Sequence, residues 1–574
     1  MAQQSTPYHV AIIGGGPGGS TTGALIKKYR PDLRVLIVER ETFPRDHIGE
    51  SHLPPISAVL DEMGCWDKVE AAGFPIKVGG TYRWGRTPEL WHFEFLPLSD
   101  FKDEPRPGKY QGFRQQTAFQ VDRSIYDSIL LDHAAELGCE VRQGTAVAEV
   151  LRDGDRVEGL RLASGEVVTA RWYVDGSGNA AILRKAMGVP TDVPTKLKCI
   201  AIWDYWENAE WAVHIGVGGT RIQVMSLGYG WLWFIPIGPT RTSLGLVCPA
   251  DHYKAIGKSP EALYLEAVAA DERIAALVAN GTRRGHVETT NDWSFLSERT
   301  TGANWFLVGE TAGFADPILS AGMTLTQTGA RELAFTLIEL LTNPGSDEPW
   351  LKRNYDTTQR ARIRQHIRFA DYWYAANGQF TDLQAHCREI AREAGLDLDP
   401  QKAWAWLAQG GFANDNVGQA GIGGCGLAAV KAVGEFLEGE ATPWQVSGHN
   451  TFHLRLEGAA RDSLPRYEAG RVYPVESLVR DGHRLPLTGF FALWVDLLGL
   501  HPRLEDLLPA LLRILQAEHP PEHQRRALGD ALGALEVLIS EGWVEATLDP
   551  SRPRLEVGAP KDSQVMHWDQ APRG

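Results

Sequence analysis

Hydrophobic positions near the N-terminus predict two buried strands with a helix between them. Residues 8–13, which end in Val-Ala-Ile-Ile, and residues 35–38 are each typical of a buried strand, and residues 20–29 of a helix. The segment 14–19, between the first strand and the helix, fits the pattern G-x-G-x-x-G. This order predicts a βαβ unit that binds a dinucleotide. The alternative is a glycine-rich turn without a ligand.

Each conserved feature of such a unit has a physical task. Gly14 permits the tight turn, Gly16 lets a pyrophosphate approach the backbone, and Gly19 allows the helix to pack closely on the strand. The N-terminus of the helix faces the phosphates. Glu39 follows the second strand, with Arg40 beside it, and is expected to accept hydrogen bonds from the ribose hydroxyls. We therefore expect these residues to bind the cofactor.

Helical periodicity returns near the C-terminus. Residues 504–517 and 525–540 carry apolar residues at helical spacing, and residues 541–548 and 554–557 look like a short wing. The pattern predicts a mostly helical, winged-helix-like domain. It lacks a concentrated basic recognition helix, so we expect a docking or cavity-covering role.

The chain divides into three expected parts. Residues 1–350 form the cofactor-binding core, with a substrate subdomain interleaved in it. Residues 351–480 are a helical extension with loops, and residues 481–574 are the C-terminal domain.

Composition narrows the class of protein. The chain has 574 residues, 43% hydrophobic and 22% charged, with a formal net charge of −15. The acidic balance argues against nucleic acid and against anionic membranes as partners. No run of about 18 apolar residues and no targeting segment is seen, so we expect a cytoplasmic protein. The six cysteines are scattered without C-x-x-C, which favours reduced thiols and no metal site.

Three later segments resemble the flavoprotein monooxygenase superfamily. They are residues 119–127 (Phe-Gln-Val-Asp-Arg-Ser-Ile-Tyr-Asp), 173–178 (Tyr-Val-Asp-Gly-Ser-Gly) and 305–313 (Trp-Phe-Leu-Val-Gly-Glu-Thr-Ala-Gly). The resemblance implies FAD, not NAD. It also implies an α/β fold with a Rossmann-like FAD-binding domain of the para-hydroxybenzoate hydroxylase type and a β-sheet substrate domain.

The same resemblance implies residues that bind the flavin. These are Gln120, Arg123, Asp175 and Gly309. The superfamily carries aspartate at the position of Glu310, where it holds a ribityl hydroxyl. The longer Glu310 is expected to do the same.

Two further segments resemble the flavin-dependent halogenases. Residues 231–236 (Trp-Leu-Trp-Phe-Ile-Pro) match W-x-W-x-I-P, and residues 314–322 match F-x-x-P-x-x-S-x-G. The second pattern occurs in halogenases of phenols, pyrroles and carrier-bound substrates. The resemblance implies a wall that separates the flavin from the substrate, although an aromatic strand packed in the core is the simpler reading of the first motif. The residues expected in this wall are Trp231, Trp233, Pro236, Phe314 and Ser320.

The segment before the next helix is expected to bind halide. Backbone amides around Gly322 and Met323, with Ser320, would hold chloride or bromide, and Pro317, Gly322 and Met323 would also contact the flavin. Leu319 stands where tryptophan halogenases carry a glutamate that assists proton removal. This difference argues against free tryptophan as the substrate.

Lys77 is the expected catalytic residue. Residues 43–51 resemble the F-P-R-x-x-x-G-E-S segment of the same family, a helix is expected at 56–72, and Lys77 then precedes a strand that ends in Trp84-Gly85. The alternative is an ordinary surface lysine. The resemblance implies that reduced FAD and O2 give a C4a-hydroperoxide that oxidises halide to hypohalous acid, and that Lys77 passes the halogen to an electron-rich carbon. Glu50 is expected beside this route.

Other functions remain open at this level. A flavin hydroxylase, a geranylgeranyl-reductase-like enzyme and an FAD-binding regulator share the first motifs. No second G-x-G-x-x-G of strand–turn–helix type follows, so a separate flavin reductase is expected to supply reduced FAD. The substrate is either a free small aromatic molecule or a group tethered to a carrier protein. Asp292, at the end of a predicted strand, is expected near the flavin edge.

Overall fold

The computed structural model describes residues 7–85, 88–96, 98–101, 104–291, 293–375, 377, 381–383, 421–422, 425–426, 444–481, 483–557 and 566–568. The chain forms two compact units. The first consists of Met1–Ile390, Glu468–Val472 and Trp568–Gly574, and the second of Ala391–Tyr467 and Tyr473–His567. The expected three-part division of the chain stays a prediction.

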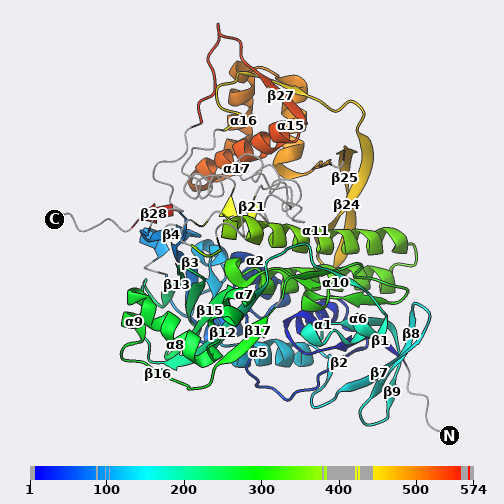
Figure 1. Cartoon of the computed structure of the whole chain (residues 1–574). Coiled ribbons are helices and arrows are strands. Elements are labelled where there is room, and N and C mark those ends of the chain that lie inside the picture. The colour runs from blue at the N-terminus through cyan, green and yellow to red at the C-terminus, as the bar shows by residue number, and fades with distance from the viewer. Residues whose placement is uncertain are drawn as a thin grey trace. The chain divides into compact units, whose positions relative to one another are not determined.

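A parallel sheet begins the first unit, in the strand order β19-β10-β1-β2-β6. Figure 1 labels its strands β1 and β2. Its strands are β1 (Tyr8–Ile13), β2 (Val35–Val38), β6 (Glu140–Arg142), β10 (Ala170–Asp175) and β19 (Trp305–Leu307). All neighbouring strands run parallel. Both predicted strands are confirmed, and helix α1 (Pro17–Tyr29) begins at Pro17, where the fixed φ of proline suits a first helical turn.

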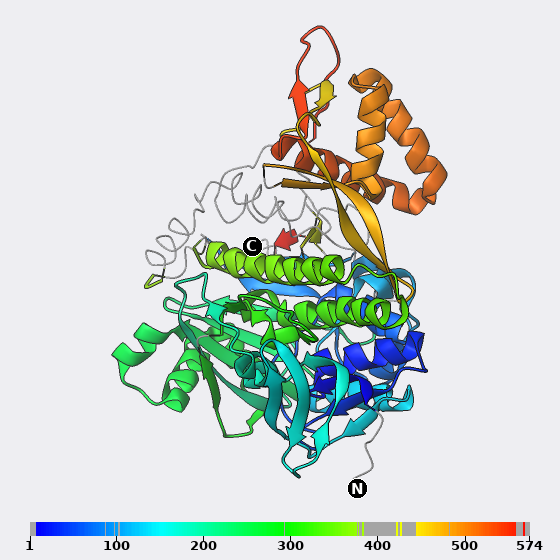
Figure 2. The same ribbon diagram turned by 90° about the vertical axis from the view of Figure 1, so that its right-hand side faces the viewer.

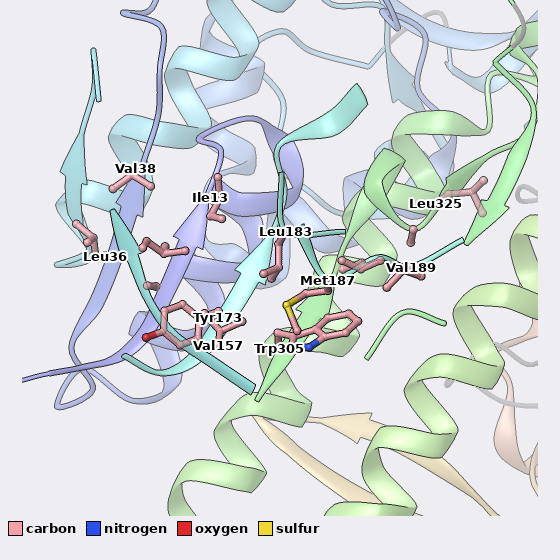
Figure 3. Packing of buried hydrophobic residues seen from close by; sticks show 14 of the residues in the cluster. Ile13, Leu36, Val38, Val157, Tyr173, Leu183, Met187, Val189, Trp305 and Leu325 are labelled. Atoms are coloured by element: carbon pink, nitrogen blue, oxygen red, sulfur yellow. The ribbon is translucent and has the colours of Figure 1, made fainter. Parts of the chain in front are cut away.

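The two faces of the parallel sheet are covered differently. Helix α1 packs on the face of Ile12 and Ile37, and it also contacts α5 (Arg123–Glu136) and α10 (Gly322–Thr342). The opposite face, with Leu36 and Tyr173, packs against a meander of three strands (Figure 3). The meander consists of β7 (Val147–Asp153), β8 (Arg156–Leu162) and β9 (Val167–Val168). Burial on both faces explains the continuous apolar runs of β1 and β2.

A second, large sheet follows the path β16-β12-β15-β14-β13-β3-β4, with β17 beside β12 and β5 beside β3. The strands are β3 (Ile76–Arg83), β4 (Trp91–Glu94), β5 (Ala118–Phe119), β12 (Cys199–Glu207), β13 (Gly219–Ser226), β14 (Trp231–Pro236), β15 (Arg241–Pro249), β16 (Thr282–Arg283) and β17 (Glu288–Asn291). Only β3 and β13 pair in parallel among the pairs within this path. One face is covered by α8 (Pro260–Ala270), which contributes Leu263 and Tyr264 to a shared core.

Smaller elements complete the first unit. They are α4 (Leu98–Phe101), α6 (Ile182–Ala186), α7 (Ala250–Ile256), α9 (Glu272–Val278), α11 (Glu348–Ala375), β11 (Thr191–Asp192), β18 (Phe295–Ser297) and β20 (Gly313–Phe314). The long helices α10 and α11 pack side by side in both views (Figures 1 and 2).

The helix expected at residues 56–72 is wrong as a single helix. The structure has two, α2 (Pro54–Met63) and α3 (Trp66–Ala71). Gly64 separates them with a φ of +82°, and its amide donates to the carbonyl of Asp61. A left-handed glycine ends a helix, because the next residues can no longer continue the hydrogen-bond ladder.

Among its described residues, the second unit is built around three helices. They are α15 (Gly489–Leu500), α16 (Leu504–Glu518) and α17 (Pro521–Ser540), and the core between them includes Trp494, Leu511 and Leu535. The strands are β23 (Thr451–Leu454), β24 (Ala460–Glu468), β25 (Arg471–Arg480), β26 (His483–Pro486) and β27 (Val544–Thr547). The two predicted helices are confirmed.

The predicted wing is only partly correct. Strand β27 forms, but it pairs with β23 and not with residues 554–557. The latter segment has no regular secondary structure, and Leu555 exchanges backbone hydrogen bonds with Gly448 and His449 instead.

Four cysteines of the described residues, Cys65, Cys139, Cys199 and Cys248, carry free thiols and are buried. Burial raises the pKa of the Cys65, Cys139 and Cys248 thiols to about 12. In the described part of the chain, none of the helices has the length and apolarity needed to cross a membrane.

Candidate active site

The glycine turn after β1 leaves no room for side chains at Gly14 and Gly19. Gly14 has a φ of +100°, and a Cβ on Gly19 would lie 2.0 Å from the carbonyl oxygen of Gly14. Gly16 is the N-cap of α1, and no side chain of the described residues caps this helix. The first amides of α1 are therefore available to a phosphate group.

Two carboxylates at strand ends bind the backbone. Glu39 accepts hydrogen bonds from the amides of Gly15 (2.7 Å) and Glu41 (2.9 Å). Asp175 is fully buried and accepts from the amides of Leu183 (2.8 Å) and Arg184 (3.0 Å), among others. Both acids shape the loops around the glycine turn, and their contacts with a cofactor stay predictions. The side chain of Arg40 is exposed and pairs with Glu41.

A charged group of side chains gathers where the loops after β10 and β19 meet. Glu310 lies in the turn that begins at Gly309. A Cβ added to Gly178 would lie 3.5 Å from Oε2 of Glu310. Burial raises the pKa of Glu310, and the charges of Arg123 and Arg45 act against this rise. Glu310 and Arg123, which were predicted from separate motifs, therefore lie close enough for their charges to interact.

Arg123 is held in place by several acceptors. Its guanidinium forms two bonds with Asp127, of 2.7 and 2.9 Å, and donates to the carbonyls of Ile48 (2.8 Å) and Gly49 (3.1 Å). Arg45 also approaches Asp127, at 3.4 Å. Sequence analysis did not single out Arg45, although it belongs to the F-P-R segment.

Buried polar atoms without partners mark the expected flavin site. Both amide atoms of Gln120 are buried and have no hydrogen-bond partner in the described part of the protein. The same holds for Oε2 of Glu50, Oγ1 of Thr324 and both ring nitrogens of His52. Buried polar groups in proteins are normally satisfied, so atoms such as these indicate a missing ligand or water. A glycine turn for the pyrophosphate and unsatisfied donors and acceptors beyond it fit FAD.

Lys77 lies inside the protein at the start of β3. It is 2% exposed, and its Nζ donates a hydrogen bond of 2.8 Å to Oγ of Ser51. Nζ also lies 5.8 Å from the ring centre of Phe95. Opposite residues in antiparallel strands point to the same side, and Lys77 is paired with Ala118 and Ser51 with Gln120. Lys77, Ser51 and Gln120 therefore share one face of a small sheet. The burial of Lys77 excludes the surface-lysine alternative.

Glu50 points to a different set of partners. It is 3% exposed, and the hydroxyls of Tyr205 of β12 and Ser243 of β15 lie near its carboxyl. Burial raises the pKa of this carboxyl to about 7, while the two hydroxyls and the charge of Arg241 act against the rise. Glu50 is thus able to hold or release a proton near neutral pH.

The tryptophans of residues 231–236 form part of an aromatic layer on β14. Trp231 and Trp233 are 2% and 6% exposed, with ring centres 6.0 Å apart. Nε1 of Trp233 donates to Oγ of Ser243 at 3.1 Å, so the strand is joined through Ser243 to Glu50. Pro236 ends the strand and is buried. The structure therefore connects two predicted groups, the wall and Glu50, that the sequence could not connect.

The loop before α10 contains the remaining predicted residues. Phe314 ends β20, Pro317 begins a short 3-10 turn, and Ser320 has a φ of +56°. A Cβ on Gly322 would lie 2.6 Å from the ring of Phe314. No side chain of the described residues caps α10, and Met323 is buried in its first turn. The amides of this turn are thus available to an anion. Asp292 lies outside the described residues.

Comparison with known proteins gives the same assignment. The family model described as tryptophan halogenase matches residues 9–106 and 101–396. A 1H-pyrrole-2-carbonyl-[peptidyl-carrier protein] chlorinase from Pseudomonas fluorescens is 29% identical over 385 residues, which are 65% of this chain and 85% of the relative. A tryptophan 2-halogenase from Chondromyces crocatus is 32% identical over 329 residues, which are 56% of this chain and 59% of that relative.

Solved structures agree on the fold. The flavin-dependent halogenase CmlS has a TM-score of 0.71 at 22% identity and is matched over 96% of this chain and 98% of its own. Together, the site and the matches define an FAD-dependent oxidoreductase that halogenates its substrate. The chain belongs to the tryptophan halogenase family.

Proposed function

We propose that Lys77 delivers halogen to an electron-rich aromatic substrate, from hypohalous acid formed on the other side of the tryptophan wall. When bound, reduced FAD together with O2 would supply the oxidising equivalents that convert chloride or bromide into hypohalous acid. Gln120, Arg123 and Glu310 are the residues that would hold it beyond the glycine turn. The observation that carries the proposal is the buried amino group of Lys77, bonded to Ser51 on the same face as Gln120.

The environment of Lys77 suits this task. A lysine that is 2% exposed meets little water, so a bound electrophile is protected from hydrolysis. Ser51 accepts one hydrogen bond and fixes the direction of Nζ, and the ring of Phe95 lies alongside. The amino group either donates a hydrogen bond to hypohalous acid or forms a haloamine with it, with loss of water.

Halide and proton have separate proposed positions. The halide lies at the uncapped N-terminus of α10, where the amides of Gly322 and Met323 and the hydroxyl of Ser320 offer donors. Glu50 holds a proton near neutral pH and passes it toward the oxidant through its unpartnered Oε2. The neighbouring Ser243 accepts a hydrogen bond from Trp233 of the wall.

The proposed substrate is a phenol or pyrrole, free or tethered to a carrier protein. An electron-rich ring loses its proton easily after electrophilic attack and needs no dedicated base. Leu319 occupies the sequence position of the glutamate of tryptophan halogenases, so the chain lacks that base. The name of the Pseudomonas relative supports a pyrrole on a carrier protein, whereas that of the Chondromyces relative would favour tryptophan.

A separate flavin reductase is proposed to deliver reduced FAD, because residues 14–19 of the FAD-binding unit are the only G-x-G-x-x-G segment between a strand and a helix in the described part of the chain. With NADH and FAD, the purified protein alone should oxidise NADH no faster than free flavin. Added reductase should start halogenation. Rapid NADH oxidation without reductase would contradict this part of the proposal.

The test of the whole proposal uses Lys77→Met with a matched control. Lys352→Met removes another lysine that donates to an oxygen and lies over an aromatic ring, 4.9 Å from the centre of Trp172. Pyrrolyl-carrier protein, phenols and tryptophan are offered with reductase, NADH and halide, and products are read by mass spectrometry. We expect Lys77→Met to lose product by about 100-fold or more while FAD binding and oxidation persist, and Lys352→Met to keep activity. Product from Lys77→Met at the wild-type rate contradicts the assignment.

A further inference from the structure

The hydroxyl of Tyr374, near the end of α11, connects two motifs that are far apart in sequence. Nε1 of Trp231 donates a hydrogen bond of 2.8 Å to this hydroxyl, and the hydroxyl donates one of 3.3 Å to Oδ1 of Asp316. Trp231 begins the tryptophan wall, and Asp316 stands directly before Pro317 in the loop that precedes α10. A single side chain from a third element therefore links wall and loop.

Asp316 organises the loop that leads to the proposed halide position. It is 5% exposed, and its Oδ1 accepts from the amide of Ile318 at 2.9 Å, which caps the 3-10 turn before Ser320. Its Oδ2 accepts from Nε1 of Trp293 at 3.1 Å. A shift of this carboxyl would therefore move the turn that determines the backbone of Ser320.

Aromatic packing fixes Tyr374 in the same place. Its ring is 5.8 Å from that of Trp84, edge to face, and Trp84 in turn is 6.3 Å from Trp231. Nε1 of Trp84 donates to the carbonyl of Trp373 at 2.9 Å. Trp84 ends the segment that contains Lys77, so three of the predicted motifs meet at the last turns of α11.

We propose that Tyr374 is a positioning residue that holds Trp231 and Asp316 in a fixed relation, so that the wall and the loop before α10 keep one geometry. The consequence for catalysis rests on the proposed function. Removing the hydroxyl leaves the indole N–H of Trp231 without its acceptor in a buried site, and Asp316 loses a donor. The indole must then turn, or water must enter between wall and loop.

The experiment replaces only the hydroxyl, in Tyr374→Phe. The matched control is Tyr355→Phe, because Tyr355 is a fully buried tyrosine of the same helix whose hydroxyl donates to the carbonyl of Leu307 at 2.8 Å. Each variant is measured for FAD affinity and for thermal unfolding. Two products are also measured per flavin oxidised: the hydrogen peroxide released and the halogen captured by a β-diketone trap. Trp231→Phe and the double variant complete a double-mutant cycle.

The expected result separates a positioning role of the Tyr374 hydroxyl from a general effect on packing. Tyr374→Phe should bind FAD within about twofold of the wild type, while captured halogen per oxidised flavin falls about tenfold and peroxide rises. Tyr355→Phe should keep the wild-type division. In the Trp231→Phe background, loss of the Tyr374 hydroxyl should change thermal stability by much less than it does alone, because the two groups form one contact.

Two outcomes overturn the proposal. One is a Tyr374→Phe variant with the same division of products as Tyr355→Phe. The other is additive effects of Tyr374→Phe and Trp231→Phe on thermal stability. A wild-type protein that yields no captured halogen with either halide contradicts the proposed function instead, and the stability cycle then still decides whether Tyr374 couples to Trp231.

Discussion

The parallel sheet and the large sheet of the first unit present their site residues by different means. In the parallel sheet the backbone forms the site. The glycine turn brings amides to a cofactor, and the carboxylates of Glu39 and Asp175 bind neighbouring backbone amides. In the glycine turn a side chain would block the backbone, and the side chains that follow it hold the loop in shape.

In the large sheet the side chains form the site. Lys77 reaches Ser51, Glu50 reaches Ser243, and Trp233 reaches the same serine. These contacts join segments that are distant in sequence. The difference teaches that the proposed cofactor half depends on local backbone shape, whereas the proposed catalytic half depends on contacts among buried side chains from distant segments.

The largest expected effect tests the backbone half. In Gly19→Ala the new Cβ would lie 2.0 Å from the carbonyl oxygen of Gly14, a backbone atom that cannot move without opening the turn. We expect FAD affinity to fall by about 100-fold, or about 3 kcal/mol. Flavin titration measures this directly. The control is Gly18→Ala, whose Cβ would meet a methyl of Thr326 at 3.3 Å, and comparable affinity of the two variants would refute the explanation.

The next effect tests the side-chain half. In Ser51→Ala the amino group of Lys77 loses its acceptor at 2.8 Å, and we expect the halogenation rate to fall about tenfold with FAD affinity unchanged. Steady-state rates with saturating FAD provide the measurement. Ser57→Ala is the matched control, because Ser57 is also buried and its hydroxyl donates to the carbonyl of Thr117 at 2.8 Å. An equal fall in both variants would indicate general destabilisation.

A pH effect tests the side-chain half thermodynamically. The pKa of Glu50 is raised by burial from 4.5 to about 7, so between these values the folded protein keeps a proton that the unfolded chain has lost. The free energy of unfolding should therefore decrease as pH rises through this window. Glu50→Gln should reduce that slope by about one proton. Part of the slope should remain, because burial also raises the pKa of Asp316 to about 6 and of Asp371 to about 7.

Denaturant unfolding at several pH values checks the slope. The exposed Glu149, replaced by glutamine, serves as the control and should leave it unchanged. An unaltered slope in Glu50→Gln would mean that Glu50 does not retain its proton.

The smallest effect concerns a contact that joins the two halves. Asp122 caps α5 by accepting from the amide of Ser124, and its other oxygen accepts from Nη1 of Arg241 in β15 at 2.6 Å. Asp122→Ala should lower the free energy of unfolding by about 1–2 kcal/mol. Asp122→Asn, which keeps a capping oxygen, should lose less, and equal losses in a calorimetric comparison would assign the whole effect to the ion pair.

The start of the parallel sheet could be predicted closely from the sequence. Strands β1 and β2, the glycine turn and α1 follow from patterns within a single short segment, where periodicity and turn chemistry agree. Gly64 marks the limit of this approach. A lone glycine is compatible with a helix interior, and only the left-handed conformation in the structure shows that the helix ends there.

The side-chain network could be predicted only in part. Lys77, Glu50 and the tryptophans were recognisable from motifs. Ser51 and Tyr374 were not singled out, because their partners lie on other elements, and hydrogen bonds between distant segments leave no periodic pattern in a single sequence. The prediction of the wing was only partly correct for a related reason. Strand β27 pairs with β23, which lies far earlier in the chain.

The buried cysteines have a consequence under the proposed mechanism, in which hypohalous acid forms within the fold. The thiolate is the form of cysteine that attacks electrophiles, and a pKa of about 12 leaves almost no thiolate at neutral pH in Cys65, Cys139 and Cys248. Escaped oxidant therefore meets thiols that are both shielded and chemically slow. Under the proposed mechanism, these three thiols are therefore poor targets for the hypohalous acid formed nearby.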